Sequence, residues 1–215
     1  MVSLNVDKIR QTFMGFLEAK RLTDLGMLEI TCVSFVADED AIFGKPDANY
    51  IKREIDWYNS QSLSVDDLEK PLPQIWADIA DDDGMINSNY GWCIFSKDNG
   101  FQYAACINEL QKNPESRRAV MIYTRPSMHV DYKSNGMTDF ICTNTVQLIS
   151  RNGRLDYLVN MRSCDAVYGY KNDIAWHRYI LEKAALDLSL KEGNIIYQVG
   201  SLHVYPRHFK LVNES

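Results

Sequence analysis

The chain carries a cysteine and an arginine–serine pair whose types could act together on an anionic substrate. Cys142 stands in a run of small and polar residues, Cys-Thr-Asn-Thr, on a predicted strand. A cysteine on a strand is commonly a core residue, whereas a reactive one needs positive charge nearby to favour the thiolate. Arg162 and Ser163 stand at the end of another predicted strand. A guanidinium fork beside a short hydroxyl donor suits a phosphate, although such pairs are also common on surfaces.

Two further pairs offer polar groups that could line a site. Arg117 and Arg118 directly precede a predicted strand, where they could bind an anion or belong to a solvated turn. His203 and Tyr205 are two positions apart, so they lie on one face of the last predicted strand. They either line a pocket or satisfy each other in the core. The residues alone leave both interpretations open for each pair.

Composition limits the class of protein. The 215 residues fit a single domain, 1–215, and 46% hydrophobic with 24% charged residues is ordinary for a globular protein. The net charge of −6 argues against polymeric nucleic acid as a partner, because surfaces that bind phosphates are usually basic. The five cysteines form no CxxC pair and have no histidines at metal spacing, so we expect neither a disulfide framework nor a metal site.

The same features favour a location in the cytoplasm. Scattered cysteines without a disulfide pattern suit a reducing compartment. The apolar runs are too short to span a bilayer, so we expect no contact with a membrane. The N-terminal residues include Asp7, Lys8 and Arg10 and lack the apolar stretch of a signal peptide, so secretion is not expected.

The pattern of apolar and polar residues predicts an α+β fold. Helices are predicted over 6–21, 50–58, 101–111 and 173–190, and strands over 28–37, 119–124, 141–149, 155–161 and 195–205. Asn152-Gly153, between two of the strands, is a strong hairpin signal. We therefore expect one substantial sheet backed by helices.

Taken together and in this order, these features resemble the thymidylate synthase family. The residues that carry the resemblance run from about 28 to 209 and comprise Glu54, Trp76, Tyr90-Gly91, Arg117-Arg118, Cys142 to Gln147, Arg162 to Asp165, Gly169 and His203-x-Tyr205. Longer segments, such as NPESRRAVMIYTRPSM and VGSLHVYPRHF, are similar to the phage branch of the family that hydroxymethylates deoxycytidylate. The resemblance implies a thymidylate-synthase-like fold with a large mixed β-sheet, one face of which pairs two subunits into a homodimer with shared active sites.

The resemblance also implies roles for the polar residues. Cys142 would attack C6 of a pyrimidine nucleotide as a covalent catalyst. The 5′-phosphate would be held by Arg162 and Ser163, and from the other subunit by Arg117 and Arg118.

Further implied roles concern the sugar, the proton transfers and the co-substrate. His203 and Tyr205 would bind the sugar hydroxyl, Glu54 and Tyr90 would move protons around the base, and Trp76 and Asp165 would bind 5,10-methylenetetrahydrofolate. No metal is implied.

Asp173 is the position that bears on which base is used. By the resemblance, Asp173 occupies the position at which thymidylate synthases carry an asparagine that pairs with uracil. Cytosine offers an amino donor at C4, which a carboxylate accepts, whereas the O4 of uracil would face it acceptor against acceptor. Once Cys142 has added to the ring, N3 can take a proton that Asp173 also accepts. We therefore expect deoxycytidylate (dCMP) as substrate and Asp173 as both a binding and a catalytic residue.

The fate of the one-carbon unit stays open at this stage. Water added to the methylene at C5 gives a hydroxymethyl group, whereas hydride gives a methyl group. Resemblance along the whole chain favours 5-hydroxymethyl-dCMP. The alternatives are a dCMP methyltransferase, a thymidylate synthase acting on dUMP, a CMP hydroxymethylase, and a catalytically silent nucleotide-binding homologue.

Overall fold

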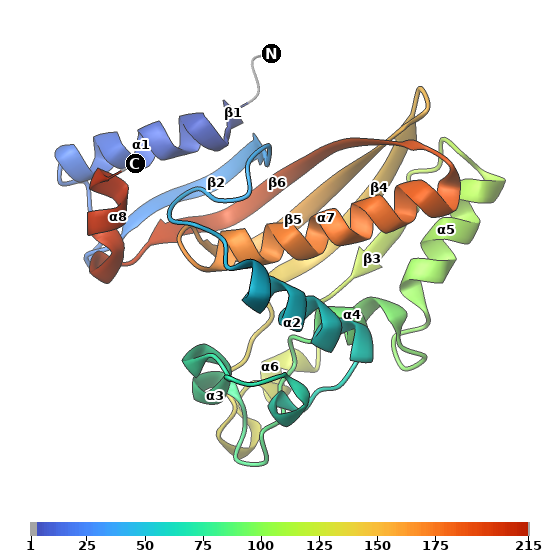
Figure 1. The fold of residues 1–215 in the computed structure, drawn as a ribbon, viewed down its shortest axis with the longest axis horizontal. Coiled ribbons are helices and arrows are strands. Elements are labelled where there is room, and N and C mark those ends of the chain that lie inside the picture. Colours follow the sequence, from blue (N-terminus) through green and yellow to red (C-terminus); the bar gives the residue numbers. More distant parts are fainter. Residues whose placement is uncertain (1–3, 215) are drawn as a thin grey trace.

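Residues 4–214 are described by a computed structural model in which most helices gather on one face of a twisted sheet (Figure 1). Within these residues the sheet has six strands in the order β1-β2-β6-β5-β4-β3. The strands are β1 (Leu4–Asn5), β2 (Leu28–Val36), β3 (Val120–Ile122), β4 (Thr143–Arg151), β5 (Arg154–Asp165) and β6 (Lys191–Val204). The β1–β2 and β5–β6 pairs are parallel and the other pairs antiparallel, so the sheet is mixed, as expected.

The described helices are of very unequal length. They are α1 (Val6–Glu18), α2 (Ala48–Ser60), α3 (Gln74–Ile79), α4 (Tyr90–Phe95), α5 (Gln102–Lys112), α6 (Met128–Asp131), α7 (Gly169–Leu188) and α8 (Phe209–Asn213), with 3₁₀ turns η1 (Val65–Asp67), η2 (Ser134–Gly136) and η3 (Pro206–His208). Helix α7 is the longest and crosses the sheet over β4, β5 and β6, with α2 and α4 beside it (Figure 1). None of the helices in the described part of the chain is long and apolar enough to cross a membrane.

The core lies between the sheet and α7. Strand side chains alternate between the two faces, and those beneath α7 are fully buried, as Val146 and Leu148 on β4 and Tyr157 and Val159 on β5 illustrate. Burying such side chains stabilises the fold by about 1.5–3 kcal/mol each relative to exposure. The same packing fixes the position of every residue that reaches from the sheet toward α7.

The predicted α+β class and its long elements are confirmed, with shifts at their ends. Asn152 and Gly153 both have positive φ, 52° and 74°, and Arg151 pairs with Arg154, so the hairpin turn is where the sequence places it. The prediction that Cys142 lies on a strand is wrong by one residue, because β4 begins at Thr143, although the carbonyl of Cys142 still accepts the backbone N–H of Arg162. Helix α7 begins at Gly169, not at the predicted 173.

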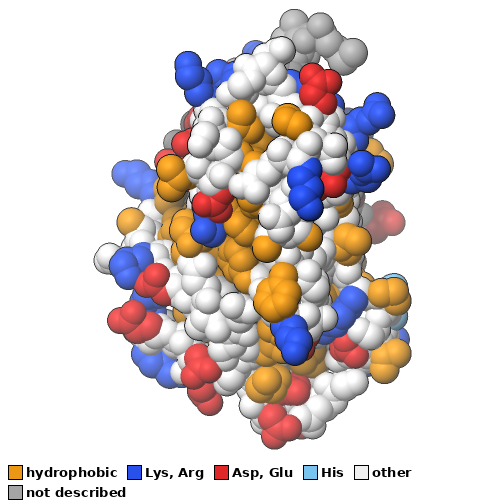
Figure 2. Space-filling model, turned by 90° about the vertical axis from the view of Figure 1, so that its right-hand side faces the viewer, with side chains coloured by type: hydrophobic (Ala, Val, Ile, Leu, Met, Phe, Trp, Pro, Cys, Tyr) orange, Lys and Arg blue, Asp and Glu red, His pale blue; other side chains and the backbone are white. Residues whose placement is uncertain are grey.

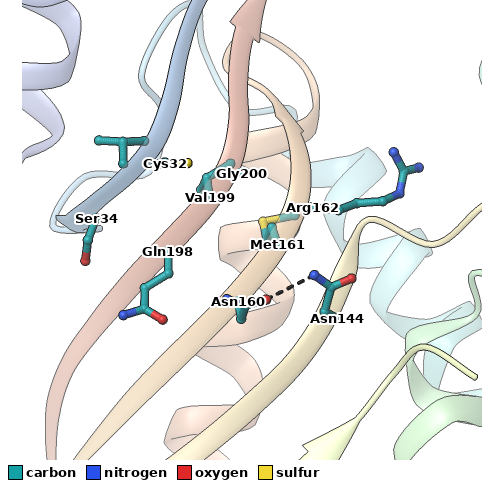
Figure 3. Close-up of a pocket in the computed structure, with 10 residues that line it drawn as sticks. Cys32, Ser34, Asn144, Asn160, Met161, Arg162, Gln198, Val199 and Gly200 are labelled. Atoms are coloured by element: carbon teal, nitrogen blue, oxygen red, sulfur yellow. Dashed lines mark hydrogen bonds between the residues drawn. The ribbon is translucent and has the colours of Figure 1, made fainter.

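The face of the sheet opposite α7 carries uncharged polar side chains on neighbouring strands. Ser34 on β2 is paired with Gln198 on β6, which is paired with Asn160 on β5. Asn144 on β4 donates a hydrogen bond to Asn160 at 3.0 Å (Figure 3). They line a shallow hollow of about 380 Å³.

Figure 2 shows another side of the molecule. Hydrophobic side chains lie along the middle of this side, and most charged side chains lie toward its margins.

Candidate active site

Cys142 and Arg162 meet where β4 and β5 pair at the end of the sheet. The backbone N–H of Arg162 donates to the carbonyl of Cys142 at 3.0 Å, and its Nη2 lies 3.8 Å from the Cys142 Sγ. The guanidinium also donates to the carbonyls of Phe140 and Ile141, which holds it over the segment that leads to the cysteine. Arg162 therefore supplies the positive charge that a reactive Cys142 requires.

Tyr90 reaches the same place from α4. Its side chain is buried, and its hydroxyl accepts a hydrogen bond from Thr143, the residue after Cys142, at 3.0 Å. This position depends on Gly91, because a Cβ there would overlap the carbonyl oxygen of Tyr58 at the end of α2. Only glycine lets the two helices approach this closely.

The carboxyl groups of Asp165 and Asp173 flank Gly169 at the start of α7. A Cβ on Gly169 would lie 3.4 Å from the Cβ of Asp165 and 3.8 Å from Oδ2 of Asp173. Asp165 ends β5, and its Oδ1 accepts the backbone N–H of Val167 at 2.8 Å, which turns the chain into the helix. A side chain at this position would therefore lie in van der Waals contact with both residues.

Burial dominates the electrostatics of this cluster. It raises the pKa of Asp173 to about 8; the charges of Glu54 and Asp165 add to the effect and a hydrogen bond from Tyr90 opposes it. Burial likewise raises the pKa of the Cys142 thiol to about 11, with Asp173 raising it further and Arg162 lowering it. Near pH 7, in the substrate-free site, Asp173 is therefore largely protonated and Cys142 is a thiol.

Glu54 is buried on α2, 5% exposed, and belongs to a short hydrogen-bond chain. Tyr50, one helical turn earlier, donates its hydroxyl hydrogen to Oε1 of Glu54. The indole Nε1 of Trp76 in turn donates to the Tyr50 hydroxyl at 2.9 Å. Burial raises the pKa of Glu54 to about 7, while the hydrogen bonds from Tyr50 and Trp76 lower it. A carboxyl group poised in this way can hold or release a proton at neutral pH.

His203 and Tyr205 lie on the strand next to Asp165. Asp165 is paired with His203 across β5 and β6, and the backbone N–H of Ala166 donates to the carbonyl of His203 at 2.9 Å. The rings of His203 and Tyr205 pack edge to face with centroids 4.9 Å apart. The histidine is on β6 and the tyrosine just follows it, so the two reach the same end of the sheet as Asp165.

The structure does not bring Arg117 and Arg118 to this cluster within one chain. Both are exposed in the connection between α5 and β3. The Arg118 Nε lies 3.2 Å from Glu109, and the Arg117 carbonyl accepts a hydrogen bond from Gln147 at 2.9 Å. A 79% exposed arginine side chain gains little from such an ion pair and is free to bind elsewhere.

Two residues of the site were missed from the sequence. Asp139 is buried and accepts hydrogen bonds from the backbone N–H groups of Asn87 and Ser88, both at 2.7 Å, so it ties the segment before Cys142 to the segment before α4. No local pattern marks such a contact between distant segments. Tyr50 could have been found, because it stands four positions before Glu54 and therefore on the same face of a helix.

Comparison with known proteins identifies the family of the chain. The sequence profile of the thymidylate synthase family matches residues 45–215. The chain is 49% identical to the deoxycytidylate 5-hydroxymethyltransferase of Enterobacteria phage T4 over 98% of its own length and 90% of that protein. It is 30% identical to a thymidylate synthase of Fusobacterium nucleatum over 75% of its length and 58% of that protein, and 27% identical to one of Francisella tularensis over 77% and 64%. The chain is therefore a member of the thymidylate synthase family.

Proposed function

We propose that this chain transfers a one-carbon unit from 5,10-methylenetetrahydrofolate to C5 of dCMP and releases 5-hydroxymethyl-dCMP. The T4, T2 and T6 relatives, each 49% identical, are named deoxycytidylate 5-hydroxymethyltransferase. The observation that carries the proposal is the carboxyl of Asp173, a partly buried residue whose surroundings include Tyr90 and Cys142. The free cysteines of the chain suit the reducing cytoplasm in which we expect the protein to act.

A protonated Asp173 suits cytosine and the first chemical step. Its hydroxyl can donate to N3 of cytosine while its carbonyl oxygen accepts from the C4 amino group. When the Cys142 thiolate bonds to C6, N3 can take the proton from Asp173, and C5 becomes the nucleophile. The resulting carboxylate then accepts from both N3–H and the amino group. In uracil N3 already bears a hydrogen, so Asp173 could not pass its proton to N3 in this step.

A protonated Asp173 would also favour the thiolate. Only an ionised Asp173 opposes ionisation of Cys142, whereas Arg162 favours it from 3.8 Å. While Asp173 keeps its proton, before C6 is attacked, its carboxyl therefore adds no charge that opposes the nucleophile.

The nucleotide's phosphate and sugar have candidate ligands in two subunits. Arg162 lies beside Cys142, and Ser163 follows it on β5, paired with Ser201. Both would bind the phosphate from the same chain, with His203 and Tyr205 at the sugar. Arg117 and Arg118 are exposed and would reach the phosphate of a partner's site. The open sheet face, with its hollow and its uncharged polar side chains, would form the interface of that homodimer (Figure 3).

The residues assigned to the folate fit its chemistry. Trp76 is 8% exposed and held edge to face against Trp57 with ring centroids 5.0 Å apart, so it offers a fixed aromatic surface. One oxygen of Asp165 is engaged by Val167, and its carboxylate can accept from the N–H donors of a pterin. The absence of a side chain at Gly169 leaves room beside Asp165. Bound here, the folate supplies the one-carbon unit at the oxidation level of formaldehyde.

Glu54 would govern the water that completes the reaction. Loss of the C5 hydrogen and departure of tetrahydrofolate would leave a methylene at C5. Water would add to this methylene while the Cys142–C6 bond breaks, which gives the hydroxymethyl group and returns the thiolate. Glu54 is buried and has a pKa of about 7, so it can take the proton that the adding water loses. Tyr90, close to Cys142, would assist the earlier removal of the C5 hydrogen.

A product assay tests the proposal. Purified protein is incubated with methylenetetrahydrofolate and an equimolar mixture of dCMP and dUMP, and the nucleotides are analysed by mass spectrometry. We expect a hydroxymethyl group on dCMP alone. Methyl-dCMP with dihydrofolate would preserve the role of Asp173 and overturn the water step, whereas a product from dUMP would contradict the role of Asp173.

A further inference from the structure

The Tyr50 hydroxyl lies between two residues that the proposed function uses separately. Tyr50 and Glu54 are four residues apart on α2 and so share one face of the helix. The first turn is fixed because the Asp47 carboxylate accepts the backbone N–H of Tyr50 at 3.1 Å. Trp76 belongs to α3, a different segment of the chain. The hydroxyl therefore bridges the base-side acid and the folate-side aromatic ring.

The direction of hydrogen bonding along this bridge is fixed by chemistry. An indole N–H can only donate, so the Tyr50 oxygen accepts from Trp76 over 2.9 Å. The hydroxyl hydrogen is then left for Glu54, whose Oε1 it contacts. Each bond polarises the next, so Trp76 strengthens the donation from Tyr50 to the carboxylate.

The loop before α3 is also tied to Tyr50. The Arg53 guanidinium lies 5.7 Å from the centroid of the Tyr50 ring. Its Nη1 donates to the carbonyls of Glu69 and Pro71, at 2.5 and 2.9 Å. If folate binding displaced α3, the contacts of Arg53 and Trp76 with Tyr50 would therefore change the position of the Tyr50 side chain.

We propose that Tyr50 is a positioning residue that orients Glu54 for proton transfer and links it to the folate side of the site through Trp76. This inference rests on the proposed function for its catalytic meaning. Tyr50 acts through Glu54 and Trp76 and need not touch the reacting atoms. The contact uses only Oε1, so the second oxygen of Glu54 is not consumed by it.

The groups that face Glu54 stay uncharged while it titrates. The charge of Glu54 helps to raise the pKa of Asp173 on α7 above its own, and burial raises the pKa values of Tyr58 on α2 and Tyr90 on α4. Donation from Tyr50 and Trp76 favours the ionised form and lowers the pKa of Glu54. Removing the Tyr50 hydroxyl therefore moves the titration of Glu54 to higher pH.

The test is the variant Tyr50→Phe, which keeps the ring and removes the bridge. The pH titration of the Glu54 carboxyl carbon is followed by NMR in protein labelled with ¹³C-glutamate. Its signal is assigned because it is absent from the spectrum of Glu54→Gln. We expect the Tyr50→Phe midpoint to lie about one pH unit above that of the unchanged protein. The acidic limb of the kcat/KM profile for dCMP should move in the same direction, because Glu54 acts as a base when ionised.

Tyr103→Phe is the matched control. Tyr103 is buried and donates to the carboxylate of Asp187 at 2.6 Å, at the junction of α5 and the end of α7. Its loss removes the same kind of hydrogen bond away from the site and should leave the Glu54 midpoint and the pH profile unmoved. Trp76→Phe provides a second variant. We expect a smaller upward shift of the Glu54 midpoint, because Tyr50 then donates less strongly to the carboxylate. If Tyr50→Phe fails to fold, this variant tests the hydrogen-bond bridge instead.

The outcomes separate the two proposals. An unmoved Glu54 midpoint in Tyr50→Phe, with kcat/KM lowered equally at every pH, would make Tyr50 a packing residue and overturn the inference. If the unchanged protein formed no product from dCMP, the proposed function would fail, and the NMR midpoint would still decide whether Tyr50 controls Glu54.

Discussion

The two faces of the sheet hold polar groups in opposite ways. On the face covered by α2, α4 and α7, the buried Glu54 and the partly buried Asp173 pair with no cation among residues 4–214, and their pKa values rise to about 7 and about 8. On the open face, Ser34, Gln198 and Asn160 are uncharged. Both faces are built from the same strands, whose side chains alternate between them.

The difference follows from what each face is proposed to do. Proton transfer at neutral pH needs carboxyl groups whose charge is made costly by burial. A surface that another subunit covers needs groups that can be buried without losing a charge, and amides that find partners meet that need. The Asn144–Asn160 hydrogen bond shows that part of the open face is already satisfied within one chain.

The largest difference in rate is expected between two variants that each replace one cysteine by serine, one on either face. Cys142→Ser on the covered side should lower product formation by at least about 10³-fold, because the nucleophile is lost. Cys32→Ser, at an exposed position beside the open-face hollow, should leave the rate within about twofold. Both rates are measured with dCMP and methylenetetrahydrofolate. Comparable rates for the two variants would remove Cys142 from the mechanism.

Asp173→Asn should change which base is used. An amide can donate to O4 of uracil and accept from N3–H, but it cannot supply a proton to N3 of cytosine. We expect the ratio of kcat/KM for dCMP to that for dUMP to fall by about 10²-fold, consistent with ~1–3 kcal/mol for an unpaired buried group. Competition between the two nucleotides in one vessel measures the ratio directly. A ratio that stays constant would show that other residues choose the base.

The sequence was sufficient for the long elements and insufficient for the contacts between them. Helices α1 and α7 show enough turns for their apolar period to be read, and the strands around Asn152-Gly153 alternate regularly. Helices α3 and α4 have six residues each, too few to display a period. Trp76 and Tyr90 lie on these two helices, so their positions could be expected only from resemblance to a family.

The geometry around Cys142 was beyond prediction for a different reason. The approach of Arg162 depends on the register of β4 with β5, and a bulge at Thr143–Thr145 sets that register. The pKa values depend on burial by segments more than thirty residues away, as with Glu54 and Asp173. Composition and spacing carry no information on such burial.

A mixing experiment tests whether the open face pairs subunits. We expect Arg117→Ala/Arg118→Ala and Cys142→Ser to be inactive separately. In a mixed dimer one site combines the intact cysteine of one chain with the intact arginines of the other. After exchange of subunits about half of the dimers are mixed, so about a quarter of the unchanged activity per site should return. A change of Asn160→Arg on the open face should prevent this recovery, whereas recovery that persists would place the interface elsewhere.

The smallest effect concerns stability rather than rate. The folded-state pKa of Asp173 is raised to about 8, above its ordinary value near 3.8, so between these values the folded chain holds a proton that the unfolded chain releases. The free energy of unfolding must then fall as pH rises through this window. Asp173→Asn removes that titration, so the variant should gain about 2 kcal/mol relative to the unchanged protein between pH 5 and about pH 6.5. Urea unfolding at each pH measures the difference, and parallel stability curves would mean that Asp173 is ionised in the folded protein at pH 5, with its charge compensated inside the site.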